Sequence, residues 1–180
     1  MYNRSHRRRR RKHTVVPIIR EGELDIISHS PEQTARLGKR LGMLLQPGDV
    51  VCLSGDMGAG KTVFARGIGE GWGAQHRLTS PTYTLVHEHR RDDNQRLHHL
   101  DCYRMESVDE IDTIGFDDML EGNSVVLIEW AERILEAVPA QHLWIELRVI
   151  ESTRRNLLFE GHGQRHTDLV SRFQENTFGV

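Results

Sequence analysis

Residues 50–62 read VVCLSGDMGAGKT, and this stretch decides the fold class. Its apolar start, residues 50–53, is typical of a strand that is covered on both faces. Residues 55–62 match the P-loop pattern G-x-x-x-x-G-K-[ST] at every fixed position. Residues 61–71 then have the character of a helix, which is the context that the motif requires. The stretch therefore predicts a strand, a glycine-rich loop and a helix that bind ATP through its phosphates.

Each residue type in the loop has a physical task. Glycines let the backbone turn tightly and let amides approach phosphate without a Cβ in the way. Those N–H groups form an anion nest, which the positive end of the following helix reinforces. Lys61 can reach the β- and γ-phosphates, and the Thr62 hydroxyl can ligate magnesium. The predicted nucleotide-binding residues of the loop are Gly55, Asp56, Met57, Gly58, Ala59, Gly60, Lys61 and Thr62.

A magnesium–nucleotide site also needs an acidic side chain near the phosphates. Residues 125–128 form a second buried-strand run that ends at Glu129, and Asp101 stands at another strand end. Ligands of open α/β sheets bind beyond the carboxyl ends of the strands, so both carboxylates are candidates. One of them should hold the metal, directly or through water, and the other should orient the attacking water or sense the γ-phosphate. The predicted catalytic residues are Lys61, Asp101 and Glu129.

The rest of the chain mixes helices with strands and local hairpins. Ser30 can cap a helix over residues 31–46, where Pro31 suits the first position and Gln33 completes a capping box. The other expected elements are a possible edge strand at 15–19, strands at 83–89 and 96–102, a partly helical segment at 107–120, strands at 124–128, 143–150 and 156–160, and a helix at 164–173. This mixture favours a three-layer α/β P-loop NTPase fold with a mixed parallel and antiparallel sheet.

The chain has 180 residues, of which 37% are apolar and 28% are charged. This composition indicates a soluble globular protein, and we expect a single P-loop ATPase domain over residues 15–180. No apolar stretch approaches the roughly 20 residues that span a bilayer, and no signal-peptide pattern follows the basic N-terminus. We therefore expect a cytoplasmic protein without a membrane partner. Cys52 and Cys102 lie in apolar runs and are expected to be reduced core thiols.

The basic charge is concentrated at the N-terminus. Seven of the 24 basic residues lie between positions 4 and 12, whereas the rest of the chain has 17 basic and 26 acidic residues. Like charges repel one another and leave nothing apolar to bury, so residues 1–14 are predicted to be a disordered basic leader. The leader could contact RNA phosphates, or it could be a solvated extension without a function.

Two polar segments allow alternative interpretations. Residues 80–83 follow the P-loop helix, in the region that often contacts the γ-phosphate in P-loop hydrolases, but an ordinary loop is favoured here. His87, His89, His98 and His99 fall on the first predicted hairpin. A zinc site is one interpretation of them. Solvent-facing strand histidines are favoured, because no carboxylate or cysteine is convincingly placed beside them.

Taken in order, these segments resemble the bacterial TsaE family, the ATPases of tRNA threonylcarbamoyladenosine (t6A) biosynthesis. The matching pieces are SPEQT at 30–34, PGDV at 47–50, the P-loop at 55–62, SPTY at 80–83, HLDCYR at 99–104 and IEWAE at 128–132. The resemblance covers about residues 28–162. Many families share the P-loop, whereas the combination of the other motifs is much more specific. The Arg-rich leader departs from the family pattern.

The resemblance implies an ATP site with magnesium held at Thr62 and Glu129. It further implies that Asp101 is needed for hydrolysis and that Trp130 lies beside the nucleotide. The resemblance also places Thr34 near the nucleotide, together with an arginine such as Arg154 or Arg155.

Family members associate with two sugar-kinase-like partners, TsaD and TsaB, and through this complex with tRNA. ATP turnover then supports repeated formation of t6A at position 37 of tRNAs that read ANN codons, without TsaE transferring the threonylcarbamoyl group. Hydrolysis by the protein alone is expected to be slow.

Two rival functions remain open. A P-loop kinase for a small molecule is the first, but residues 106–121 contain no arginine or lysine that would suit a phosphate-binding lid. A nucleotide-gated binding module without catalysis is the second. A GTPase is disfavoured because no Asn-Lys-x-Asp segment is present, and an AAA-type motor is disfavoured by the length of the chain.

Overall fold

The computed structural model describes residues 21–81 and 83–179. The strands are β1 Glu23–Ser28, β2 Val50–Ser54, β3 Val86–Arg90, β4 Arg96–Asp101, β5 Ser124–Glu129, β6 His142–Val149 and β7 Arg155–His162. The α-helices are α1 Pro31–Gly42, α2 Lys61–Trp72, α3 Phe116–Glu121 and α4 Gln164–Phe178, with 3-10 helices η1 Val108–Ile114 and η2 Ala131–Ile134. The predicted leader at 1–14 and edge strand at 15–19 lie outside the described residues.

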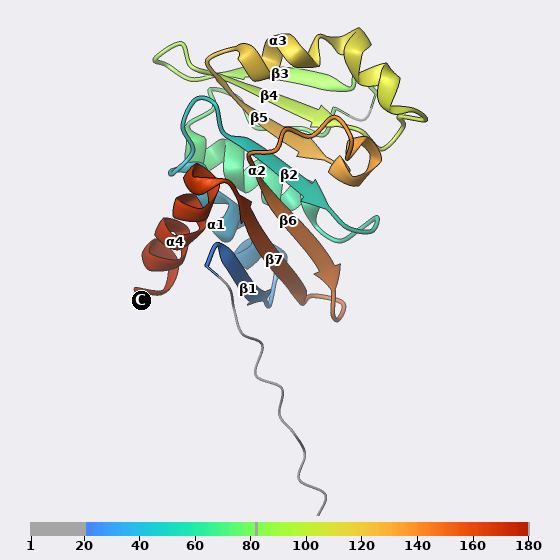
Figure 1. Cartoon of the computed structure of the whole chain (residues 1–180). Coiled ribbons are helices and arrows are strands. Elements are labelled where there is room, and N and C mark those ends of the chain that lie inside the picture. The colour runs from blue at the N-terminus through green and yellow to red at the C-terminus, as the bar shows by residue number, and fades with distance from the viewer. Residues whose placement is uncertain (1–20, 82, 180) are drawn as a thin grey trace, which may run out of the picture.

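One mixed sheet organises these elements (Figure 1). Its strand order is β1-β7-β6-β2-β5-β4-β3. The central strands β6, β2, β5 and β4 run parallel to one another, whereas β1 pairs with β7, β7 with β6 and β3 with β4 in antiparallel fashion. The prediction of a mixed parallel and antiparallel sheet is confirmed. Because β2 lies between β6 and β5, the P-loop that follows β2 reaches the edge where other parallel strands also end.

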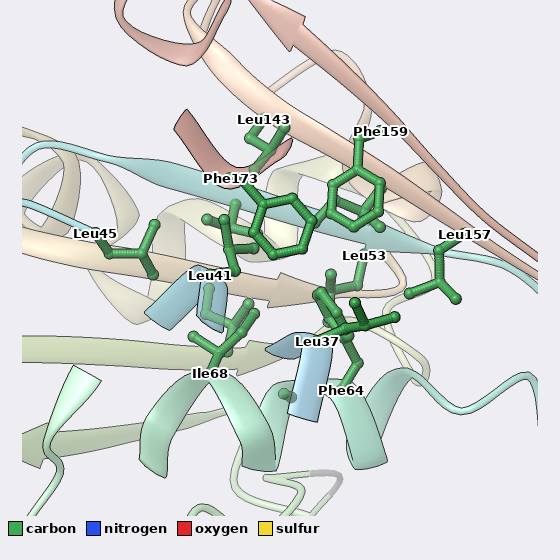
Figure 2. Packing of buried hydrophobic residues seen from close by; sticks show 14 of the residues in the cluster. Leu37, Leu41, Leu45, Leu53, Phe64, Ile68, Leu143, Leu157, Phe159 and Phe173 are labelled. Carbon is green, nitrogen blue, oxygen red and sulfur yellow. The ribbon is translucent and has the colours of Figure 1, made fainter. Parts of the chain in front are cut away.

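Helices cover both faces of the sheet, which gives the expected three layers (Figure 1). Side chains of β2 alternate between the two sides: Leu53 joins the core beneath α1, α2 and α4, and Cys52 joins the core beneath η1, α3 and η2. Figure 2 shows the first of these cores, where Phe64 from α2 meets Phe159 from β7 with ring centroids 6.1 Å apart. Phe159 also packs on Phe173 from α4, at 5.0 Å.

Helix α1 begins at the predicted N-cap, Ser30, but the predicted capping box is not complete, because the Gln33 side chain pairs with the residue before the cap. The Ser30 side chain accepts a hydrogen bond from the Gln33 backbone N–H, and the Gln33 side chain accepts one from the His29 backbone. Helix α1 also packs very closely on α2. A Cβ added to Gly67 would stand 2.1 Å from the carbonyl oxygen of Ala35, so only glycine permits this approach. The close contact holds the P-loop helix firmly against α1.

The structure corrects several element boundaries. Strand β1 was not predicted, although Leu24 and Ile26 alternate inward along it, because the exposed apolar Ile27 obscures the pattern. Helix α1 ends at Gly42 rather than at residue 46, and α4 continues to Phe178. The segment predicted to be partly helical at 107–120 is divided at Gly115, which has a left-handed backbone with φ 71° and separates η1 from α3.

Cys52 and Cys102 are buried and free, as expected. Among the described helices, none combines the length and the apolar character that crossing a membrane would require.

Candidate nucleotide-binding site

The P-loop takes a conformation that depends on its glycines. Gly55, Gly58 and Gly60 have φ angles of 125°, 78° and 104°. A Cβ at Gly55 would also stand 2.1 Å from the carbonyl oxygen of Leu147 on β6. The loop leads directly into α2, whose first-turn N–H groups have no side-chain cap. Such a helix start offers unpaired N–H donors and the positive end of the helix dipole to an anion.

Lys61, the first residue of α2, is turned back onto the loop that precedes it. Its ammonium group donates to the carbonyl oxygens of Gly55 and Asp56, the latter at 2.9 Å. It also lies 3.5 Å from the ring centroid of Trp130, a cation–π contact. Burial lowers the pKa of Lys61 below its ordinary value, and the nearby carboxylates of Glu132 and Glu129 oppose that shift.

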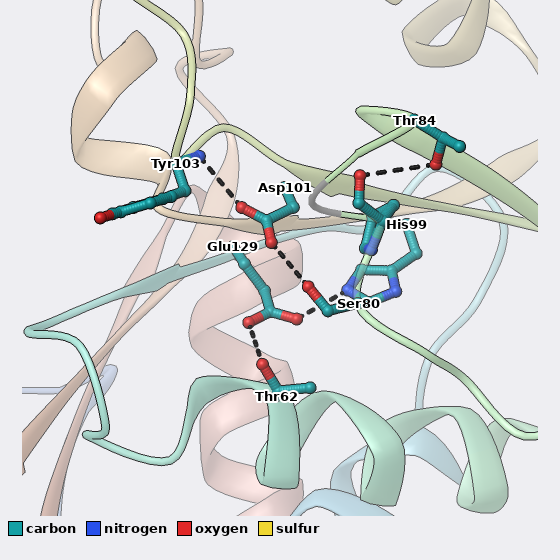
Figure 3. A network of polar contacts seen from close by, with 8 residues as sticks. Thr62, Ser80, Thr84, His99, Asp101, Tyr103 and Glu129 are labelled. Carbon is teal, nitrogen blue, oxygen red and sulfur yellow. Dashed lines mark hydrogen bonds and ion pairs between the residues drawn. The ribbon is translucent and has the colours of Figure 1, made fainter.

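A chain of hydrogen bonds joins α2 to the ends of two strands (Figure 3). The Thr62 hydroxyl donates to Oε2 of Glu129, which is the last residue of β5, at 2.8 Å. The other carboxylate oxygen of Glu129, Oε1, lies 2.9 Å from Nε2 of His99 on β4. Both Glu129 and His99 are buried. The Glu129 carboxylate is therefore held at both of its oxygens.

Asp101 lies directly beside Glu129, because the two residues are register partners in the parallel pair of β4 and β5. Its Oδ2 accepts a hydrogen bond from the Ser80 hydroxyl at 2.7 Å, and its Oδ1 accepts one from the Tyr103 backbone N–H at 3.0 Å (Figure 3). Ser80 belongs to the segment that follows α2. The favoured interpretation of that segment, an ordinary loop, did not anticipate the contact between its serine and a predicted catalytic carboxylate.

These groups open onto one cavity of about 380 Å³. It is lined by Met57, Gly58, Gly60, Lys61, Thr62, Val63, Ser80, Asp101, Tyr103, Glu129 and Trp130. Trp130 has a left-handed backbone with φ 60°, which is uncommon for a residue with a bulky side chain. Its ring packs on that of Tyr103, with centroids 4.9 Å apart. The strained turn after β5 thus directs an aromatic wall into the cavity.

A smaller cavity of about 90 Å³ also borders the P-loop. It is lined by Pro31, Thr34, Gly58, Gly60, Val63, Thr153 and Arg155. The buried hydroxyl of Thr34 is hydrogen-bonded to Ser28 at 2.8 Å. Arg155 donates to the carbonyl oxygens of Ala59 and Gly58 and so braces the loop.

Arg154, the neighbour of Arg155, pairs instead with Glu151 in the β6–β7 connection. It does not line either of these two cavities. Of the two arginines that the resemblance allowed, Arg155 is the one that contacts the P-loop.

The expectation that the hairpin histidines face solvent is wrong for His99, which is completely buried. His99 faces α2 together with Asp101, whereas its neighbour His98 is half-buried on the opposite face. Strict alternation along β4 would have placed His99 and Asp101 on one face from sequence alone. No group of three or more His, Cys, Asp and Glu side chains within residues 21–81 and 83–179 is arranged to hold a metal ion.

Comparisons with known proteins agree on one family. The family model described as threonylcarbamoyl adenosine biosynthesis protein TsaE matches residues 28–157. A Bacillus subtilis protein named tRNA threonylcarbamoyladenosine biosynthesis protein TsaE is 39% identical over 147 residues, covering 82% of this chain and 91% of the relative. A protein of the same name from Treponema pallidum is 38% identical over 131 residues, covering 73% and 96%.

A solved structure is similar as well. The crystal structure of Bacillus subtilis YdiB superimposes with a TM-score of 0.71 at 32% identity, covering 86% of this chain and 95% of that one. The matched part of the chain contains the P-loop, Asp101 and Glu129. The chain therefore belongs to the TsaE family of threonylcarbamoyl adenosine biosynthesis proteins.

Proposed function

We propose that this chain is a magnesium-dependent P-loop ATPase that supports formation of t6A at position 37 of tRNAs that read ANN codons. It acts in a complex with TsaB and TsaD, and ATP hydrolysis resets that complex between rounds rather than transferring the threonylcarbamoyl group. Membership of the TsaE family supports the pathway. The assignment of ATPase activity is supported by the position of Thr62, Glu129 and Asp101, which line one cavity beside the P-loop.

The residues beside the P-loop fit a magnesium ion. Magnesium prefers oxygen ligands and usually binds through one or two carboxylates together with substrate phosphates, rather than in an all-protein cage. Thr62 and Glu129 would supply these oxygens. A hydroxyl has one hydrogen and two lone pairs, so Thr62 can keep its hydrogen bond to Glu129 while a lone pair faces the metal. Bound magnesium would neutralise charge that develops on the phosphate oxygens.

Lys61 is the group that changes partners in this proposal. Its ammonium now contacts two backbone carbonyl oxygens and the ring of Trp130. The β- and γ-phosphates carry full negative charge and attract the ammonium more strongly than neutral carbonyl groups do. ATP binding therefore withdraws Lys61 from Trp130, and the indole ring reports on the occupancy of the site.

Asp101 is assigned to hydrolysis rather than to binding. It lies beside Glu129 at the carboxyl end of its strand, and its two oxygens are oriented by Ser80 and Tyr103. A carboxylate held in this way can orient a water molecule for attack on the γ-phosphate. Its link to Ser80 also joins this step to the segment after α2.

The smaller cavity is proposed to receive the nucleoside part of ATP. It shares Gly58, Gly60 and Val63 with the larger cavity, so the P-loop and the first turn of α2 form a common wall. The phosphates would lie on the Thr62 side and the base on the Thr34 side.

The test is ATP hydrolysis by the purified chain, alone and with TsaB and TsaD, for the unaltered protein and for Asp101→Asn. Asp92→Asn, on the exposed β3–β4 turn, is the matched control. A strong rise with the partners that is absent only in Asp101→Asn supports the proposal. Phosphate passed to a small molecule without a partner effect would favour the kinase. ATP binding without turnover in the full complex would favour the binding module.

A further inference from the structure

His99 and Glu129 form a buried side-chain contact beside the P-loop helix. Both side chains are buried, with exposed fractions of 0% and 1%. The Nε2 atom of His99 lies 2.9 Å from Oε1 of Glu129, on the side of the carboxylate opposite Thr62 (Figure 3). His99 and Glu129 come from neighbouring strands, and Thr62 comes from the helix that packs across them.

The direction of this hydrogen bond follows from its partners. An ionised carboxylate can only accept hydrogen bonds, so the hydrogen of the contact belongs to Nε2 of His99. The other ring nitrogen, Nδ1, is buried and has no hydrogen-bond partner among the described residues. A buried polar atom without a partner destabilises a fold, so an apolar side chain would suit this position better on packing grounds. The hydrogen bond to Glu129 is the interaction that an imidazole makes at this position and an apolar side chain would not.

A glutamate needs this support more than an aspartate would. Glutamate has one more rotatable bond than aspartate, so its carboxylate loses more conformational freedom when it is fixed at a metal. Thr62 holds only one oxygen of Glu129, and a carboxylate held at one oxygen can still swing. The second donor, His99, removes that freedom before the metal arrives.

We propose that His99 is a positioning residue, whose imidazole fixes the Glu129 carboxylate in the orientation in which Glu129 and Thr62 bind magnesium with ATP. The proposal rests on the magnesium role assigned to Glu129 above. His99 does not line the larger cavity, whereas Glu129 does. Its effect on the site is therefore proposed to pass through its hydrogen bond to Glu129.

The test measures ATP binding by the full chain in a magnesium titration and, separately, in excess EDTA. His99→Leu removes the donor and keeps an apolar side chain in the core, whereas His99→Gln keeps an amide N–H that reaches about as far as Nε2. His98→Gln is the matched control, because it changes the adjacent histidine on the opposite face of the sheet. Melting temperatures establish that each variant is folded.

The expected result is that His99→Leu raises the magnesium concentration for half-maximal binding by about tenfold, the low end of the usual cost of losing such a support. Binding in EDTA stays unchanged, and His99→Gln and His98→Gln behave like the unaltered chain. An unchanged magnesium requirement in His99→Leu would overturn the proposal. A loss of ATP binding in EDTA as large as the loss with magnesium would also overturn it, because a residue with a purely structural role would weaken both equally.

A second pair of variants covers the case in which His99→Leu does not fold. His99→Asn and His99→Gln carry the same amide group and differ only in reach. Asparagine is too short to contact Glu129 and should show the raised magnesium requirement, whereas glutamine should not. Equal behaviour of the two folded variants would contradict the proposal. Neither TsaB nor TsaD is present in these assays, so their outcome is independent of whether the chain supports t6A formation.

Discussion

The hydroxyl oxygen of Thr62 lies 2.8 Å from Oε2 of Glu129, although the two residues are 67 positions apart in the chain. The parallel pairing of β2 with β5 makes this contact possible, because it places Leu53 in register with Glu129. The P-loop then crosses from the end of β2 to the start of α2, which returns Thr62 to the end of β5. A single strand pairing thus joins the phosphate-binding loop to its acidic partner.

Replacing the Thr62 hydroxyl should remove the magnesium-dependent part of ATP binding. Thr62→Val keeps the shape of the side chain but has no oxygen ligand. We therefore expect the factor by which magnesium strengthens ATP binding to be about tenfold smaller, or less still, than in the unaltered chain. Thr62→Ser keeps the hydroxyl and should retain most of the effect. The measurement is the dissociation constant of ATP with magnesium and with EDTA. A Thr62→Val chain that still responds fully to magnesium would exclude Thr62 as a ligand.

ATP binding should change the fluorescence of Trp130. The ammonium of Lys61 lies over that indole ring, and the phosphates are expected to withdraw it. A titration with ATP should therefore change tryptophan emission, and Trp130→Phe should abolish the change although Trp72 and Trp144 remain. Lys61→Ala should abolish ATP binding, since the phosphates lose their principal cation. An emission change that persists in Trp130→Phe would show that the signal arises elsewhere.

Removing the charge of Glu132 should strengthen ATP binding. One oxygen of its carboxylate accepts a hydrogen bond from the Gly55 backbone N–H at 3.4 Å, so a negative charge stands beside amides that are to hold phosphate. We expect Glu132→Gln to lower the dissociation constant of ATP about threefold at low salt, with a smaller effect at high salt. Glu136→Gln, at a nearby exposed position, is the control. Weaker binding in Glu132→Gln would instead make its carboxylate part of the binding site.

The folded chain should lose stability as the pH falls from about 6.5 to about 4. Burial, together with the neighbouring His99, His87 and His76, lowers the pKa of His89 from 6.5 to about 4. Between these values the unfolded chain binds a proton that the folded chain does not. The free energy of unfolding therefore decreases as the pH is lowered.

His89→Gln should make that loss smaller. The measurement is the urea midpoint between pH 7.5 and pH 4.5, with His29→Gln at an exposed position as the control. A pH dependence that is identical in His89→Gln and in the unaltered chain would show that His89 has the same pKa in the folded and the unfolded chain.

Local patterns predicted most of the fold and the central part of the site. The apolar run before the P-loop, the capping residues at Ser30 and Gln33, and the hairpins each depend on neighbouring residues, so their signals are complete within a short window of sequence. The two acidic strand ends were found for the same reason. Because ligands bind beyond the carboxyl ends of the strands, Asp101 and Glu129 were both candidates from sequence, and the parallel register of β4 and β5 places them side by side.

The features that escaped prediction depend on contacts between distant segments. Strand β1 exists because β7 pairs with it, a partner more than a hundred residues away. Arg155, the first residue of β7, donates to a carbonyl oxygen of the P-loop. No feature of the neighbouring sequence distinguishes it from Arg154. His99 was judged by its polarity, which is a poor guide for a side chain whose partner is another buried polar group.

The register of β4 against β5 makes the site intolerant of one kind of sequence change. Leu97, His99 and Asp101 point toward α2 only while each stays opposite its partner on β5. An insertion at an exposed position of the connection at 102–123 would leave that alignment intact. One extra residue inside β4 would turn Asp101 to the other side of the sheet and bring a neighbour of different chemistry in its place. Insertions and deletions among homologous chains should therefore occur in the connections and not within residues 97–101.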